Sequence, residues 1–483
     1  MSFTPEIEPK KHSNKNTLIS IGIALLMLLS FIGGYFMQRL TRPPQVQTIV
    51  EVVELIDKVG YVYDPTTGEY VELDGDKVAE SIANNFLDQY STYYTKDEYD
   101  KIKEEAKGNY KGFGVSYDLV NNRVIKVVGN SPAEEAGLKV GDQISAGKKE
   151  TDAQFTDLEN GQAVSEFLTI CNESQYTFKV VRDGAVQPVE ISMKKAAYRA
   201  TYVKYYDSEG SVTFDYNDKN ELQVVENKGT DKTLPELAAK TDVCVVKLDA
   251  FEGQAFEQIK KAFEFASNKN ITQLVLDLRG NGGGQLDILQ NICSLLITGK
   301  GTDAVRIAYA QEKERVEGFS AVATSRCMFE KISIIADENT ASASESLIGA
   351  MLYHHGEKYN NETYSAKDYY SYYNNDTCTV FGYGRLILVG ADDTARTYGK
   401  GIMQTTYQLA SGGALKLTTA KLFWPDYLQR KENATCIHGT GITTKMGAKA
   451  ATAEQALARA IAALNENAIV NPAPSTPEQP PVA

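Results

Sequence analysis

The sequence of 483 residues predicts a multidomain α+β protein, with an apolar N-terminal helix, a helical region, a small β domain and a mixed α/β core. Three observations support this fold class. Residues 17–37 are uncharged and mostly apolar, short β-runs separated by turns begin near residue 108, and strands alternate with helices from residue 243 onward. These are the patterns of a transmembrane helix, of a small β domain and of a largely parallel sheet covered by helices.

The apolar run at residues 17–37 would span ~31 Å as a helix, against a hydrocarbon core of ~30 Å. A cleavable signal peptide is the alternative, but its apolar region should be shorter and should end in small residues. This run ends in Tyr35, Phe36 and Met37. Three lysines precede it and two arginines follow. We therefore expect a cytoplasmic tail (1–16), a single-pass signal anchor in the cell membrane, and the bulk of the chain outside the cytoplasm.

The net charge and the numbers of cysteines and histidines indicate which ligands and cross-links to expect. The net charge of -13 argues against a nucleic-acid partner, because no basic stripe is present to neutralise phosphates. The six cysteines are scattered and only four histidines occur, so no metal site is expected. Cys244 and Cys293 lie in apolar runs and are predicted to be buried thiols. Cys378 and Cys436 lie in polar loops, where a disulfide is conceivable outside the cytoplasm, although the sequence does not assign it.

Residues 38–107 are predicted to form a linker and a mainly helical region without a catalytic constellation. A β domain is expected at 108–195. Its stretch SPAEEAGLKVGDQI places Pro132 at the first position of a short helix and Gly137 at the end of that helix.

This stretch resembles the pattern of a PDZ domain. In that family a glycine-containing loop offers backbone amides to the terminal carboxylate of a peptide, which then pairs as an added strand. The resemblance implies a peptide-binding loop at Gly112, Phe113, Gly114 and Val115, with Phe113 and Val115 as pocket walls. A simple turn made by the same glycines is the structural alternative.

The core is expected at residues 196–466, where apolar runs alternate with helical patterns. Such alternation implies a largely parallel sheet, with functional loops beyond the carboxyl ends of its strands. The predicted strands are 243–248, 274–278, 332–335 and 386–390.

One of these loops carries the sequence TASASE (340–345) just before a helical pattern. Ser342 suits a nucleophile, because the unpaired amides at a helix N-terminus can stabilise an oxyanion. Ser342 and Glu345 also fit a Ser-x-x-Glu capping box, which needs no chemistry. On this stretch alone, capping is the simpler interpretation.

Two other loops contain glycine, DLRGNGGG (277–284) and GKGIMQ (399–404). Neither completes a dinucleotide or phosphate-binding motif, so no cofactor is expected. Together with TASASE, the PDZ-like pattern and the strand LKLTTA (415–420), these loops resemble the carboxyl-terminal processing peptidases, or tail-specific proteases. The resemblance covers about residues 49–464 and implies a mixed α/β serine protease core.

The resemblance implies a role for each site residue. Ser342 is the nucleophile, Lys400 is the general base and Gln404 orients the lysine. The backbone amides of Gly284 and Ala343 form the oxyanion hole. A lysine must be neutral to act as a base, yet its ordinary pKa is ~10.4. We therefore expect Lys400 to be buried, because burial lowers the pKa of an amine.

The implied activity is that of a membrane-anchored serine endopeptidase that recognises exposed C-terminal tails of proteins and peptides through its PDZ domain and forms an acyl-enzyme. The sequence does not decide whether the protein forms a homo-oligomer. Ser342 and Lys400 are 58 positions apart, which is more than the resemblance to this family implies, so we expect an insertion at about 354–385. The proline-rich residues 467–483 are expected to be disordered. The alternative is a catalytically inactive PDZ scaffold that binds peptide tails.

Overall fold

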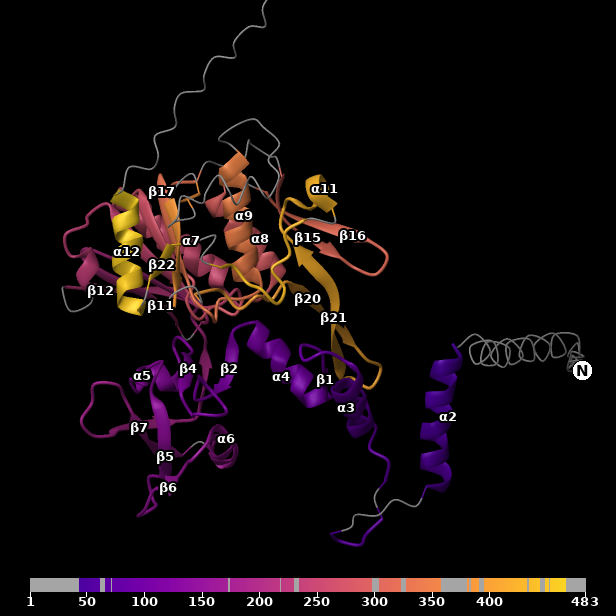
Figure 1. Cartoon of the computed structure of the whole chain (residues 1–483). Helices are drawn as coiled ribbons and strands as arrows, with labels where there is room; N and C mark the ends of the chain where they lie inside the picture. The colour runs from indigo at the N-terminus through magenta and orange to yellow at the C-terminus, as the bar shows by residue number, and fades with distance from the viewer. Residues whose placement is uncertain are drawn as a thin grey trace, which may run out of the picture. The chain divides into compact units, whose positions relative to one another are not determined.

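The computed structural model is shown in Figure 1. It describes residues 43–60, 66–70, 72–172, 174–217, 219–229, 234–297, 304–322, 327–357, 380–381, 384–390, 395–431, 434–443, 448–450 and 452–465. The expected tails (1–16 and 467–483), the expected anchor (17–37) and most of the expected insertion therefore lie outside the described residues. The chain divides into two compact units, Met1–Ile82 and Ala83–Ala483.

The first unit contains α2 (Pro44–Val59) and the beginning of α3 (Gly75–Phe86). Proline starts α2, where its missing N–H costs nothing. No described side chain of α2 is buried, and Ile49, Val52 and Leu55 are exposed. Within the part of the chain that the structure describes, no helix is both long and apolar enough to span a bilayer.

The predicted β domain forms around its own core within the second unit. Its elements are β2 (Asn109–Gly112), β3 (Val115–Tyr117), β4 (Val124–Val127), α5 (Pro132–Glu135), β5 (Gln143–Lys149), β6 (Thr156–Asp157), α6 (Gly161–Ile170), β7 (Gln175–Val181), β8 (Val189–Lys194) and β9 (Ala196–Arg199). As expected, Pro132 opens α5, and Gly137 follows it with a φ of 80°. Val124, Ile144 and Phe178 belong to a core that is separate from that of the remaining sheets.

The predicted peptide-binding loop is anchored to the core of the β domain by Phe113. This buried side chain has its ring centroid 5.7 Å from that of Phe178. Gly114 has a φ of 81°, and a Cβ there would lie 2.2 Å from Cβ of Ser131. Gly112 ends β2 and the half-buried Val115 begins β3. The positive φ of Gly114 therefore sets the shape of the loop, and the buried Phe113 side chain anchors the loop to the core of the β domain.

The core contains a nine-stranded sheet in the order β12-β11-β10-β13-β14-β17-β19-β18, with β22 also paired to β19. Strands β13, β14, β17, β19 and β22 are parallel, as the strand–helix alternation predicts. The bounds are β10 (Val203–Asp207), β11 (Gly210–Tyr216), β12 (Leu222–Lys228), β13 (Val243–Leu248), β14 (Gln273–Asp277), β17 (Lys331–Ala336), β18 (Val380–Phe381), β19 (Gly384–Val389) and β22 (Ala448–Ala450).

Helices cover both faces of this sheet (Figure 1). Side chains alternate along each strand, so Cys244 and Val246 of β13 face one core and Val243 and Val245 face another. The first core includes residues of α7 (Ala255–Asn268), α8 (Leu286–Leu296) and α9 (Ala343–Glu357). The second includes α12 (Ala453–Asn465). Burial on both faces explains why these strands read as continuous apolar runs.

The predicted thiols lie in the first core. Cys244 and Cys293 are fully buried, as expected, and burial raises the pKa of both thiols. Cys436 is free, and Cys378, weighed as its disulfide partner, lies outside the described residues.

A second, five-stranded sheet was not expected from the sequence. It runs β1-β21-β15-β16, with β20 also paired to β21. Here β1 (Thr92–Tyr94), which lies between α3 and α4 (Lys96–Ala106), pairs antiparallel with β21 (Ala414–Phe423). The remaining strands are β15 (Ala304–Gln311), β16 (Val316–Val322) and β20 (Ile402–Gln408). This pairing brings the segment before β1 next to the strands that follow the lysine loop.

Candidate functional site

The glycine loop and the serine loop follow neighbouring parallel strands, β14 and β17, and Asn281 joins them. The amide of Asn281 donates to the carbonyl of Leu248 at 2.8 Å, and its Oδ1 accepts from the Gly283 N–H at 2.9 Å. Its backbone oxygen accepts from the Ala341 N–H and the Ser344 hydroxyl, each at 3.0 Å. Asn281 was not among the predicted site residues, although an asparagine between two glycines is a signal of a tight turn.

Ser342 lies immediately before α9 in a left-handed conformation, with a φ of 57°. A residue other than glycine in this region costs about 1–3 kcal/mol, and such strain gathers at functional sites. Half of the predicted capping box is formed, because the Ser342 N–H donates to Oε2 of Glu345 at 2.9 Å. The other half is not: the Ser342 hydroxyl makes no hydrogen bond with any described residue. The hydroxyl is therefore left for another partner.

Glu345 ties the serine loop to the lysine loop. Its carboxylate is fully buried, and Oε2 accepts from the backbone N–H groups of both Ser342 and Lys400, each at 2.9 Å. Since both nitrogens bind one oxygen atom, they cannot be farther apart than twice that distance. Oε1 accepts from the Gly399 N–H at 2.8 Å and from the Thr397 hydroxyl. Burial raises the pKa of Glu345, while these four donors oppose the rise.

The lysine loop is held from its other side by the turn at residues 437–442. The Gly439 N–H donates to the Gly399 carbonyl at 2.9 Å. Gly399 has a φ of 88°, and a Cβ on Gly401 would lie 2.7 Å from the backbone nitrogen of His438. Both glycines beside Lys400 are thus required by close packing of backbone on backbone.

Lys400 is half-buried rather than fully buried. Burial is the main cause that lowers its pKa, and the positive charge of Lys416 lowers it further. The negative charges of Asp88 and Glu345 oppose this change. The Lys400 amine lies 5.4 Å from the ring centroid of Tyr90, which comes from the segment before β1. A lowered pKa enlarges the neutral fraction of the amine, which is the form able to take a proton.

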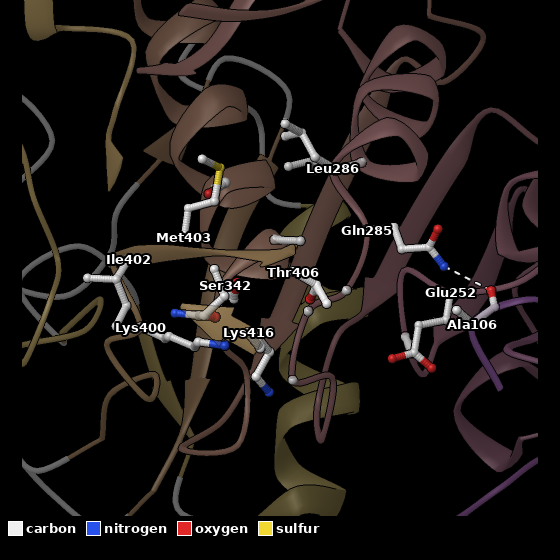
Figure 2. A pocket seen from close by; sticks show the side chains of 18 of the residues that line it. Ala106, Glu252, Gln285, Leu286, Ser342, Lys400, Ile402, Met403, Thr406 and Lys416 are labelled. Carbon is white, nitrogen blue, oxygen red and sulfur yellow. Dashed lines mark hydrogen bonds between the residues drawn. The ribbon is translucent and has the colours of Figure 1, made fainter. Parts of the chain in front are cut away.

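A cavity of about 640 Å³ brings the predicted site residues together (Figure 2). Ser342, Lys400, Gln404, Gly284 and Ala343 all line it. Its apolar wall includes Leu286, Leu289, Phe319, Ile402, Met403 and Leu422.

Two of these predicted roles can be compared with the hydrogen bonds at the cavity. The amide of Gln404 donates to the Thr418 hydroxyl at 3.3 Å, and no hydrogen bond between Gln404 and Lys400 is found among the described residues. Within the same ranges, the backbone N–H groups of Gly284 and Ala343 have no acceptor. They are therefore available to a ligand in the cavity, as an oxyanion hole requires.

These features define a class of site. A hydroxyl at the start of a helix shares one cavity with an amine of lowered pKa and with two unpaired amides. This is the arrangement of a serine-type hydrolase, in which a base activates the hydroxyl and backbone donors stabilise the oxyanion. Within the described ranges, no group of three or more histidine, cysteine, aspartate or glutamate side chains is placed to bind a metal ion.

Comparison with known proteins gives the same class. Residues 242–358, which include the glycine loop and Ser342, match the profile of peptidase family S41. The chain is 26% identical over 394 residues to a probable CtpA-like serine protease of Staphylococcus epidermidis, covering 80% of this chain and 64% of that protein. The predicted resemblance to the carboxyl-terminal processing peptidases is therefore confirmed, and both comparisons support a serine-type peptidase.

Further relatives have the same description. A probable CtpA-like serine protease of Staphylococcus aureus (strain COL) is 24% identical over 400 residues, covering 80% of this chain and 63% of that protein. The chain thus spans slightly less than two thirds of the length of these relatives. Among solved structures, the photosystem II D1 C-terminal processing protease is 17% identical with a TM-score of 0.47, covering 86% of this chain and 97% of that one.

Gly283 offers a direct test of how tightly the two loops must meet. With a φ of 99°, a Cβ there would lie 2.8 Å from Cβ of Ser342 and 2.8 Å from the nitrogen of Ala343. We expect Gly283→Ala to lower the free energy of unfolding by about 2–4 kcal/mol and to abolish cleavage. Gly282→Ala is the matched control, because a Cβ at Gly282 meets nothing within 4 Å. Urea denaturation and a peptidase assay check both variants; equal stability of the two would contradict this packing.

Proposed function

We propose that this protein is a serine endopeptidase in which Ser342 is the nucleophile and Lys400 the general base. The observation that carries the proposal is the shared carboxylate oxygen of Glu345, which holds the backbone of both residues at the edge of one cavity. A capping role of Glu345 accounts for its hydrogen bond to Ser342, but not for its hydrogen bond to Lys400. A Ser-Lys mechanism needs a base and a nucleophile. The Lys400 amine, with its lowered pKa, supplies the base, and the Ser342 hydroxyl, which has no hydrogen bond among the described residues, supplies the nucleophile.

In the first half-reaction, neutral Lys400 takes the proton of the Ser342 hydroxyl as Oγ bonds to the carbonyl carbon of the scissile peptide. The carbonyl oxygen becomes an oxyanion and accepts from the N–H groups of Gly284 and Ala343. Collapse of this intermediate breaks the C–N bond, and the Lys400 ammonium gives its proton to the leaving amine. The product is an acyl-enzyme on Ser342.

In the second half-reaction, Lys400 takes a proton from water, and the resulting hydroxide attacks the acyl carbon. The C–Oγ bond then breaks and Ser342 recovers its proton from the lysine, which frees a peptide carboxylate. Gln404 acts as a positioning residue on the β20 side of the lysine, anchored by its hydrogen bond to Thr418. Because the amide carries no charge, it does not raise the pKa of the amine.

The substrates that we propose are proteins and peptides with exposed C-terminal tails outside the cytoplasm. The β domain at 108–195 would bind the tail as a PDZ domain does, through the backbone amides beside Gly112 and Gly114. Residues 17–37 would anchor the protein in the membrane as a single helix. The names of the CtpA-like relatives are consistent with this class of protease.

Replacing Ser342 with alanine tests this function. We expect Ser342→Ala to lower the rate of cleavage of a denatured protein by at least about 10³-fold, because no acyl-enzyme can form. Ser294→Ala, at a partly exposed serine of α8 that does not line the cavity, should cleave like the wild type. Mass spectrometry of the products from a mixture of secreted proteins would also give the cleavage sites. A wild type that binds tail peptides yet cleaves nothing would instead favour the inactive scaffold.

A further inference from the structure

Lys416 is a second lysine of the cavity. It lies in the LKLTTA stretch (415–420), but the proposed mechanism gives it no role. It lies on β21, the strand between β20 and β1, with Thr406 and Thr92 as its partners in register. Its amine lies 5.6 Å from the ring centroid of Tyr94. Lys416 lines the same cavity as Ser342 and Lys400, and Figure 2 draws the three side chains in one region. Strands on both sides fix the backbone from which the amine extends.

The charge of Lys416 has no counter-ion among the described residues. No salt bridge of Lys416 is found in those ranges. Its positive charge acts on Lys400, where the negative charges of Asp88 and Glu345 oppose it. Two glutamates also line the cavity, Glu105 and Glu252, but neither forms an ion pair with Lys416. Glu252 instead accepts from the Tyr110 hydroxyl at 3.2 Å. Lys416 is half-buried on the wall of the cavity, where its ammonium is placed to attract an anionic group of a ligand.

We propose that Lys416 is a specificity-determining residue that binds a carboxylate of the substrate close to the scissile bond. This inference rests on the proposed peptidase activity of Ser342. The carboxylate is either the side chain of an aspartate or glutamate, or the terminal carboxylate of the chain being cleaved. Both have the same chemistry, and a peptide has no other ordinary anionic group. The apolar wall of the cavity would take the neighbouring side chains, while the amine fixes where the charged group lies.

A bound carboxylate would also act on the base. It would compensate the charge of Lys416, which otherwise lowers the pKa of Lys400. Acidic substrates should therefore bind more tightly but require a higher pH for full turnover. A purely structural lysine would not couple the substrate's charge to the pH profile.

The experiment compares fluorogenic peptides that carry glutamate or glutamine at each position around one cleavage site, each with a free or amidated C-terminus. For wild type we expect one acidic position, or the free terminus, to raise kcat/KM by about tenfold or more, mainly through KM. Lys416→Gln should remove this preference, and Lys416→Glu should shift it toward peptides with lysine at the same position. Lys421→Gln is the control, because Lys421 is exposed on the same strand and does not line the cavity.

Binding of the same peptides to the Ser342→Ala protein separates the two proposals. A carboxylate preference in the dissociation constant that disappears in the Ser342→Ala, Lys416→Gln double variant supports the role of Lys416, even where the wild type shows no cleavage. Cleavage by the wild type with equal kcat/KM for every charge pattern would overturn the inference and leave the peptidase intact. Equal affinities in the binding experiment would overturn it as well.

Discussion

Lys400→Met is expected to lower kcat by at least about 10³-fold while the protein remains folded. Methionine keeps a flexible chain of similar length in the space beside Tyr90, but it cannot take the proton of Ser342. The backbone N–H of residue 400, which binds Glu345, is retained. Lys421→Met, on the exposed part of β21, should leave kcat unchanged. Steady-state kinetics on one peptide substrate would check both variants.

The same substitution should raise stability at neutral pH. The pKa of Lys400 is lowered in the folded protein, so the folded state disfavours the charged amine. Below the folded pKa this cost is fully present, and it disappears as the pH rises toward the ordinary value of 10.5. Lys400→Met should therefore be more stable than wild type at pH 7, by a margin that shrinks toward pH 10.5. A margin independent of pH in urea denaturation would contradict the lowered pKa.

Glu345→Gln is expected to affect both activity and stability. Each carboxylate oxygen of Glu345 accepts two donors, so an amide would turn one acceptor into an NH₂ group that faces two N–H or O–H donors. Leaving such buried donors unsatisfied should lower the free energy of unfolding by about 2–4 kcal/mol. Loosening of the two loops should lower kcat by about 10²-fold or more, because Ser342 and Lys400 lose their common support.

Glu257→Gln is a close control for this substitution. Glu257 occupies the third position of α7, as Glu345 does in α9, but its side chain is exposed. We expect its stability to change by less than about 0.5 kcal/mol and its activity to stay at the wild-type level. If Glu345→Gln behaved like Glu257→Gln, the carboxylate would not be what holds the serine and lysine loops together.

The sequence alone was sufficient for the parallel strands and for the position of Ser342 just before a helix. Strand β13 is a continuous apolar run that ends in a turn, and Ser342 precedes an apolar helical pattern, so each has a local signal. Strand β1 has none, because three residues are too few to show a period and its partner β21 lies more than 300 positions away. Tyr90, whose ring centroid lies 5.4 Å from the Lys400 amine, reaches the site through that same long-range pairing.

The role of Glu345 could likewise be predicted only where its partner is close in the sequence. Its capping interaction with Ser342 is local and was predicted as one alternative. Its hydrogen bonds to Thr397 and Gly399 join residues 52 and 54 positions apart, and nothing in either segment indicates the other. The inward packing of Phe113 was unpredictable for a related reason. Whether an aromatic side chain beside two glycines faces inward depends on Phe178, which comes from a strand far along the chain.

Covalent labelling of Ser342 at varied pH tests its activation by Lys400 most directly. A fluorophosphonate reacts with an activated serine, and mass spectrometry of the digested protein identifies the residue that carries the adduct. We predict one adduct, on the peptide that contains Ser342, with a rate that rises with pH to a plateau and falls by at least about 10²-fold in Lys400→Met. Labelling of Ser342 at the same rate in Lys400→Met, or labelling of a different serine, would contradict the Ser-Lys assignment.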